Sequence, residues 1–192
     1  MRVFARAFRR AGLPVRMSQG FNPHPRFSLP WPLPTGIEGL AEVLELDLTA
    51  DLAPAELARR VSHELPAGLD ILDADRLPPG EKARVRSVRY RAAGAVPAGS
   101  TERCAARAEI RATRADGREL DVRPYLHRIR PCEGGCEFEL LVTETGTARP
   151  AEIVAALCED HPERARQLAL TRTAVNLRSP RSPEPPMHPV GR

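Results

Sequence analysis

The first apolar pattern along the chain is helical. Phe4, Ala5 and Phe8 recur at helical spacing between arginines, and Gly12 followed by Pro14 ends the pattern in the usual order of helix stop signals. The sequence therefore predicts that the chain opens inside a helix.

The next patterns predict short elements. Leu44, Leu46 and Leu48 alternate with polar residues, which is typical of a half-buried strand. The full expectation for this part of the chain is strands at 15–18, 27–29, 42–49 and 69–72 and a helix at 53–65. Together with the first helix, these elements predict one α+β unit over residues 1–77.

A second unit is predicted after Pro78-Pro79-Gly80, a sequence that marks a boundary. Asp116-Gly117 suits a type I′ turn between two strands, and Pro150 suits the first turn of a helix. The expected elements are strands at 85–91, 110–113, 119–122, 138–143 and 174–177 and helices at 101–107 and 151–158. They follow the general order strand, helix, strand, strand, helix, strand, which predicts helices on one face of an antiparallel sheet over residues 84–178. The proline-rich residues 179–192 are expected to be a disordered tail.

Composition places the chain among globular proteins, with 42% hydrophobic and 28% charged residues. No run approaches the roughly 18 to 20 apolar residues that cross a bilayer, and the first residues lack the apolar region of a signal peptide. We therefore expect a cytoplasmic protein without a membrane partner. Four cysteines in a chain without an export signal predict reduced thiols.

Positive charge is concentrated at the start of the chain. No acidic residue precedes Glu38, whereas the balance reverses over 38–81. Such asymmetry predicts a surface for an anionic partner. The alternative is that the arginines form the solvated face of a helix. The arginines before Glu38 are Arg2, Arg6, Arg9, Arg10, Arg16 and Arg26.

Three segments carry a resemblance to a known family. They are Arg9-Arg10-Ala11-Gly12-Leu13-Pro14, Ser18-Gln19-Gly20-Phe21-Asn22-Pro23-His24-Pro25 and Leu33-Pro34-Thr35-Gly36-Ile37-Glu38. They resemble the opening of the radical SAM-linked family, a domain of unknown function encoded beside, or fused behind, a B12-binding-type radical SAM protein. Looser matches extend the resemblance to Leu177. The resemblance implies a radical SAM protein, encoded nearby, as a partner.

Similar proteins begin earlier than this chain, with a strand and a Ser-His-Leu-Asp-type segment. We therefore expect that Met1 is an internal methionine of a longer reading frame or that the first strand has been lost. The expected fold class is α+β, with two tandem ferredoxin-like units of antiparallel sheet. The first unit would lack its opening strand.

The segment from Ser18 to Arg26 carries the candidate binding chemistry. Two prolines restrict the backbone around His24, so a rigid loop would present its imidazole. Guanidinium, imidazole and aromatic groups contact phosphates and stack on bases. The alternative is structural, with Phe21 in the core, Asn22 bonded within its own loop and His24 packed between prolines. The expected RNA-binding residues are Arg6, Arg9, Arg10, Gln19, Phe21, Asn22, His24 and Arg26.

Catalytic and metal chemistry have weaker support in the sequence. His24 could act as a general base, but no partner for it can be identified. Cys132 and Cys136 resemble half of a metal knuckle without a second pair, so we interpret them as flanking a hairpin turn. We expect no metal and no cofactor.

Three functions stay open at this point. The first is a non-catalytic accessory that binds or presents tRNA or rRNA for a radical SAM enzyme. The second is a protein-binding scaffold for that enzyme without RNA contact. The third is an RNA-processing enzyme of the repeat-associated type, which also uses paired ferredoxin-like units.

Overall fold

The structure is a computed structural model that describes residues 2–114 and 116–178. The chain divides into two compact units, Met1–Ala83 and Arg84–Arg192. Both contain helices and antiparallel strand pairs, which confirms the α+β class. The disordered tail expected at 179–192 lies outside the described residues.

Unit 1 is built from short elements. Its sheet pairs β1 with β3 in antiparallel fashion, with Phe27 opposite Leu46 and Ser28 opposite Glu45. The elements of unit 1 are α1 (Arg2–Arg10), β1 (Phe27–Ser28), β2 (Glu38–Gly39), β3 (Glu45–Leu46) and α2 (Pro54–Ser62). The predicted helices at both positions and the strand at 27–29 are therefore present.

An aromatic cluster joins α1 to β1. The ring of Phe8 meets that of Phe27 edge to face at 5.3 Å between centroids, and Phe4 lies 6.2 Å from Phe8 and 6.4 Å from Phe27. Ala7 and Phe8 are buried, so the apolar face of α1 turns into the unit. The arginines of α1 are left on its exposed face, as the apolar spacing requires.

Two strands predicted in unit 1 do not form. Residues 15–18 make only isolated bridges, from Val15 to Leu48 and from Met17 to Pro25. Residues 69–72 form no strand, and Leu69 and Leu72 are exposed. The short apolar pattern at 69–72 has no strand partner among the described residues, and an unpaired strand would leave its backbone groups unsatisfied.

Unit 2 contains a sheet in which β9, β4, β8 and β7 are neighbours in that order. All adjacent pairs are antiparallel. The elements of unit 2 are β4 (Val85–Ala93), α3 (Ser100–Ala106), β5 (Arg111–Thr113), β6 (Glu119–Asp121), the 3-10 turn η1 (Arg123–Tyr125), β7 (Leu126–Cys132), β8 (Gly135–Leu141), α4 (Pro150–Leu157), α5 (Pro162–Ala165) and β9 (Ala169–Leu177).

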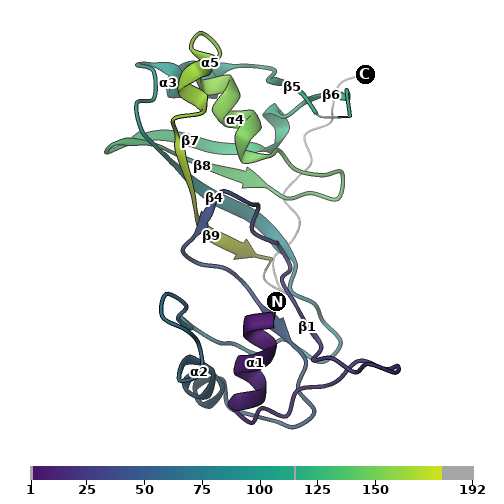
Figure 1. Cartoon of the computed structure of the whole chain (residues 1–192). Coiled ribbons are helices and arrows are strands. Elements are labelled where there is room, and N and C mark those ends of the chain that lie inside the picture. The colour runs from purple at the N-terminus through teal and green to yellow at the C-terminus, as the bar shows by residue number, and fades with distance from the viewer. Residues whose placement is uncertain (1, 115, 179–192) are drawn as a thin grey trace. The chain divides into compact units, whose positions relative to one another are not determined.

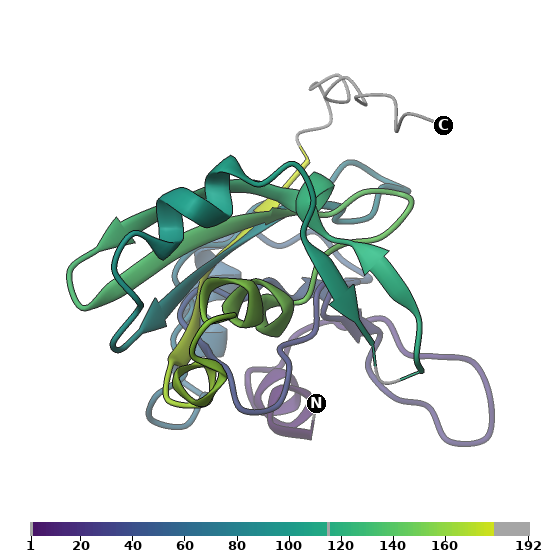
Figure 2. The ribbon, with the colours of Figure 1, turned by 90° about the horizontal axis from the view of Figure 1, so that it is seen from above.

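The core of unit 2 lies between this sheet and its helices. Val88, Tyr90, Phe138 and Leu140 are each at most 2% exposed, and the rings of Tyr90 and Phe138 stack at 5.6 Å. Helices α3, α4 and α5 all lie on one face of the sheet (Figure 1, Figure 2). The prediction of helices on one face of an antiparallel sheet is thus confirmed for unit 2.

The hairpin at Asp116-Gly117 differs from its prediction in two ways. Its strands β5 and β6 form a separate two-stranded sheet, and β7 and β8 instead join the main sheet, where β7 is an edge strand. Gly117 takes a positive φ of 79°, and its N–H donates to the Arg114 carbonyl oxygen at 2.8 Å. Gly117 therefore closes the turn, and the prediction of a type I′ turn with Asp116 and Gly117 as its two central residues is wrong.

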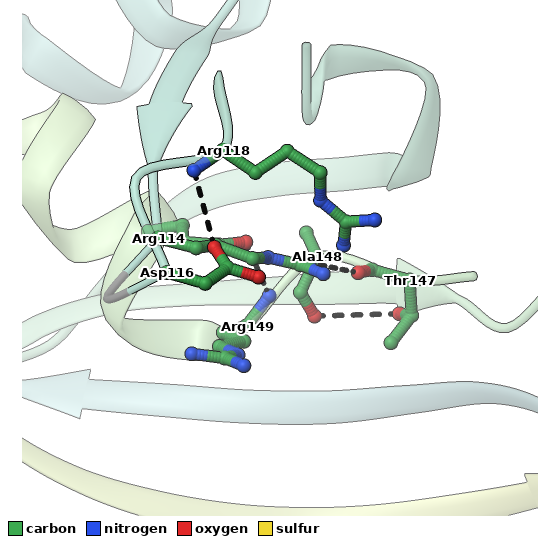
Figure 3. A network of polar contacts seen from close by, with 7 residues as sticks. Arg114, Asp116, Arg118, Thr147, Ala148 and Arg149 are labelled. Atoms are coloured by element: carbon green, nitrogen blue, oxygen red, sulfur yellow. Dashed lines mark hydrogen bonds and ion pairs between the residues drawn. The ribbon is translucent and has the colours of Figure 1, made fainter. Parts of the chain in front are cut away.

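A polar network holds the β5–β6 hairpin to the start of α4 (Figure 3). Arg114 Nε donates to Glu152 Oε1 at 3.0 Å, and its Nη2 donates to the Thr147 carbonyl oxygen at 3.0 Å. The second carboxylate oxygen of Glu152 accepts from the Arg149 backbone N–H at 2.7 Å. Glu152 therefore serves both as a cap of α4 and as the partner of Arg114.

The expected tandem of two ferredoxin-like units is not confirmed. Among the described residues of unit 1, strand pairing within the unit consists of β1 with β3 and of isolated bridges. Unit 2 alone has the longer antiparallel sheet with helices between its strands.

Candidate functional site

The segment that follows α1 forms a narrow loop with a fixed base. Met17 and Pro25 form an antiparallel bridge, and the Arg26 backbone N–H donates to the Arg16 carbonyl at 2.8 Å. In Figure 1 this loop is the dark purple segment that reaches away from the rest of unit 1. Its base is joined to β3 because the Arg16 N–H donates to the Asp47 carbonyl at 2.8 Å.

Ser18 and His24 close the loop above that base. The Ser18 N–H donates to the His24 carbonyl at 2.9 Å, and the His24 N–H donates to Ser18 Oγ at 3.1 Å. Ser18 Oγ also lies 3.0 Å from His24 Nδ1, which is 3.3 Å from the Asn22 carbonyl oxygen. The imidazole is thus turned inward at Nδ1, and three contacts between two residues fix the loop.

The tip of the loop is open to solvent. Gln19, Phe21 and Asn22 are all exposed, and Phe21 has a relative exposure of 105%. The structural alternative of a buried Phe21 is therefore wrong. A rigid loop carries an aromatic ring whose two faces are free, and such a ring can stack on a base or enter an apolar groove.

Two of the four predicted arginines are held by carboxylates. Arg10 Nε lies 2.8 Å from Glu64 Oε2, and its guanidinium also donates to the Glu64 carbonyl. Arg26 Nε lies 3.3 Å from Asp47 Oδ2. These pairs are partly exposed, so both guanidiniums contribute less free positive charge than the sequence alone predicts.

The other two predicted arginines retain their charge. Arg6 and Arg9 are exposed on α1, and among the described residues neither has an ion pair or a side-chain hydrogen bond. The same holds for Arg2 and Arg16 in the part of the chain that the structure describes. Unit 1 therefore presents four unneutralised guanidiniums on α1 and at the base of the loop.

A hollow of about 330 Å³ lies beside the base of the loop. Glu45 on β3 is its most buried charged group, with a side chain 8% exposed. Its carboxylate accepts from Lys82 Nζ at 2.5 Å and from the Ala83 N–H at 2.8 Å. The Glu45 hydrogen bond raises the pKa of Lys82. The hollow is lined by Ser18, His24, Pro25, Arg26, Phe27, Ser28, Glu45, Asp47 and Lys82.

Three charged residues of this hollow, Glu45, Asp47 and Lys82, were not among the predicted site residues. Glu45 and Asp47 occupy alternate positions on one strand and so share a face, which is the signal that could have indicated them. Lys82 follows a Pro-Gly turn, and nothing in its sequence neighbourhood indicates that it lies beside them. Arg26 and Lys82 in the hollow form ion pairs with its carboxylates. The exposed tip of the loop is therefore more accessible to a ligand than the hollow is.

The cysteine pair is part of a hairpin, as predicted. Cys132 ends β7 opposite Gly135, and Cys136 on β8 is fully buried. Burial raises the pKa of Cys136 to about 12, so its thiol stays neutral and poorly suited to bind a metal. Residues 2–114 and 116–178 contain no cluster of three or more His, Cys, Asp or Glu side chains placed to hold a metal ion.

The fold and the loop define a two-unit α+β protein with a rigid, exposed aromatic loop beside free arginines. The chain belongs to the family described as an uncharacterized protein conserved in bacteria (DUF2344), whose pattern matches residues 1–153. No curated protein matches the chain. Among the described residues, no helix has both the length and the apolar character needed to span a membrane.

Proposed function

We propose that this protein is a non-catalytic, RNA-binding accessory that presents tRNA or rRNA to a radical SAM enzyme in the cytoplasm. The observation that carries the proposal is the complete exposure of Phe21 at the tip of a loop fixed by Ser18 and His24. The free guanidiniums of Arg6 and Arg9 add positive charge in the same unit. Aromatic stacking together with arginine is the usual chemistry of single-stranded RNA recognition.

The surroundings of His24 offer it no catalytic partner among the described residues, which favours binding over catalysis. A general base must lie within reach of the proton that it removes. Nδ1 is held by Ser18 and the Asn22 carbonyl oxygen, so only Nε2 could act as the base, and within residues 2–114 and 116–178 no nucleophilic side chain is hydrogen-bonded to it. The RNA-processing enzyme is therefore the less supported reading.

The order of helices and strands in unit 2 gives the proposed function additional support. Unit 2 follows the order β-α-β-β-α-β when the small β5–β6 hairpin is set aside, with β9-β4-β8-β7 as the sheet order. We propose that unit 2 is ferredoxin-like on this basis. Fold analogy alone is weak support for function, so the loop and the arginines carry the argument. The radical SAM partner rests on the resemblance of the Ser18 to Pro25 segment to the radical SAM-linked family.

A protein-binding scaffold is the second candidate, because unit 1 also exposes apolar side chains. Leu40 is 64% exposed, Met17 42% and Val3 44%. Apolar surface of this kind is used to bind proteins when it gathers in one patch. Ribonuclease treatment distinguishes the two candidates. The chain is immobilised, and retention of the radical SAM protein encoded nearby is measured before and after digestion. Retention should survive digestion only if the two proteins contact each other directly.

The RNA proposal predicts a steep and specific salt dependence. Replacing Arg6 and Arg9 together with glutamine should remove two phosphate contacts and lower the slope of log affinity against log salt by about 1.4 for single-stranded RNA. The measurement is fluorescence anisotropy of a labelled single-stranded RNA over a series of salt concentrations.

The matched control replaces Arg59 and Arg76 with glutamine. These arginines are also exposed in unit 1, but they pair with Glu56 and Asp51 at 2.8 Å. The control removes the same formal charge and should leave the slope nearly unchanged. Equal effects of the two variants, or no salt-dependent binding by the unaltered chain, would refute the RNA proposal.

A further inference from the structure

The helix-free face of the unit 2 sheet carries charged side chains. Val88, Tyr90 and Phe138 point into the core beneath the helices, so the alternate residues of the same strands point to the other face. Figures 1 and 2 show α3, α4 and α5 gathered on the opposite face. The residues of the helix-free face are Ser87, Arg89 and Arg91 on β4, Glu137, Glu139 and Leu141 on β8, Arg128, Arg130 and Cys132 on β7, and Thr171, Ala174 and Asn176 on β9.

The strand register arranges the charges in two rows, which we call the arginine ladder. Arg89 on β4 stands opposite Glu139 on β8, which stands opposite Arg128 on β7. The second row places Glu137 between two further arginines. Successive rows are two residues apart along each strand, or roughly 7 Å. The ladder consists of Arg89, Glu139 and Arg128 in the first row and Arg91, Glu137 and Arg130 in the second.

The glutamate of the first row does not neutralise its neighbouring arginines. Glu139 Oε1 accepts from Ser87 Oγ and, at 3.2 Å, from Asn176 Nδ2. Arg89 and Arg128 are exposed, and within residues 2–114 and 116–178 neither guanidinium has an ion pair or a hydrogen bond. A cross-strand charge row kept for sheet stability would instead pair these groups directly.

The second row is partly satisfied. Arg130 Nη2 lies 2.7 Å from Glu137 Oε2, and Arg91 Nη2 donates to the Glu133 carbonyl at 2.8 Å. Bonding to a carbonyl leaves the positive charge of Arg91 in place. The ladder thus keeps a net positive charge, with its two free guanidiniums on either side of an engaged carboxylate.

We propose that the arginine ladder binds the sugar-phosphate backbone of RNA, with Arg89 and Arg128 as its phosphate contacts. The choice of RNA rests on the proposed function, whereas the choice of phosphate rests on the ladder. The planar guanidinium of arginine can donate to two phosphate oxygens at once, which no other side chain does as well. Two uncommitted guanidiniums on one face of the sheet, with one strand between them, can each take one phosphate.

The residue types of the face select the backbone over the bases. The residues of this face named above include no Phe, Tyr or Trp, so they offer none of the large aromatic rings on which a base can stack. Contacts to phosphate position a nucleic acid without reading its sequence. The ladder therefore binds RNA independently of sequence, whereas the exposed ring of Phe21 belongs to unit 1.

The test is RNA affinity of the full chain carrying Arg89→Gln and Arg128→Gln. At about 50 mM salt we expect binding weaker by on the order of tenfold, with a salt slope lower by about 1.4 and with similar losses for RNAs of unrelated sequence. Arg89→Lys with Arg128→Lys keeps the charge and should restore most of the salt slope. Far-ultraviolet circular dichroism checks that each variant is folded.

The matched control is Arg103→Gln with Arg166→Gln, two arginines of unit 2 on or beside helices α3 and α5. It should bind RNA as the unaltered chain does. The inference is overturned if the ladder variant binds RNA normally, or if it loses only ribonuclease-resistant retention of the radical SAM protein. In either case, if the unaltered chain binds RNA, the proposed function still holds. If the unaltered chain does not bind RNA, both the proposed function and the ladder inference are refuted.

Discussion

Replacing Arg114 with leucine should lower the free energy of unfolding of unit 2 by about 3 to 5 kcal/mol. The side chains of Arg114 and Glu152 are only 15% and 10% exposed, and their charged atoms are 3.0 Å apart. Loss of the guanidinium would leave the Glu152 carboxylate buried without its counter-ion. The Thr147 carbonyl would lose its donor at the same time (Figure 3).

The double replacement Arg114→Leu with Glu152→Leu separates this cause from a simple loss of packing. An apolar pair of similar volume removes the unpaired charge and should recover much of the lost stability. The measurement is urea unfolding followed by near-ultraviolet circular dichroism, because both tyrosines, Tyr90 and Tyr125, lie in unit 2. A double variant as unstable as the single one would show that the ion pair is not the source of the effect.

Phe138→Ala should destabilise unit 2 by about 3 to 5 kcal/mol through a cavity in its core. Phe138 is 1% exposed and stacks on Tyr90 with ring centroids 5.6 Å apart. A domain of this size has roughly 5 to 15 kcal/mol of stability in total, so the loss takes a large share of it.

Unit 1 supplies an internal reference for that experiment. Trp31 is the chain's one tryptophan and lies in unit 1, so its fluorescence follows unit 1 while the tyrosines follow unit 2. The control Leu177→Ala removes a side chain that is 39% exposed and should cost no more than about 0.5 kcal/mol. Comparable losses in Phe138→Ala and Leu177→Ala would contradict the described core.

Local sequence patterns predicted the elements whose start signal or apolar spacing lies within the element itself. Helix α4 begins at Pro150 as expected, and α1 follows the spacing of Phe4 and Phe8. The prediction of a strand at 69–72 was wrong because a run of two or three apolar residues forms a strand only where a partner strand is available. The prediction of a type I′ turn at Asp116-Gly117 was wrong because the hydrogen bond that closes the turn ends at Gly117 instead of spanning it.

The candidate site was predictable in its position but not in its contacts. The prolines and glycine around His24 indicated a rigid loop, and the structure adds that Ser18 is the residue that holds it. No periodicity could show that Arg10 would meet Glu64, because the two are far apart in sequence. The arginine ladder likewise could not be predicted from the sequence, because it depends on the register of β4, β8 and β7.

The exposed ring of Phe21 tests the central claim most directly. Affinity of the full chain for a labelled single-stranded RNA should fall by about 1 to 3 kcal/mol in Phe21→Ala, roughly 5- to 150-fold, because one stacked base is lost. Phe21→Trp should retain binding, and neither change should alter unfolding, since the ring is 105% exposed. An affinity that is the same for phenylalanine and alanine at this position would contradict the account.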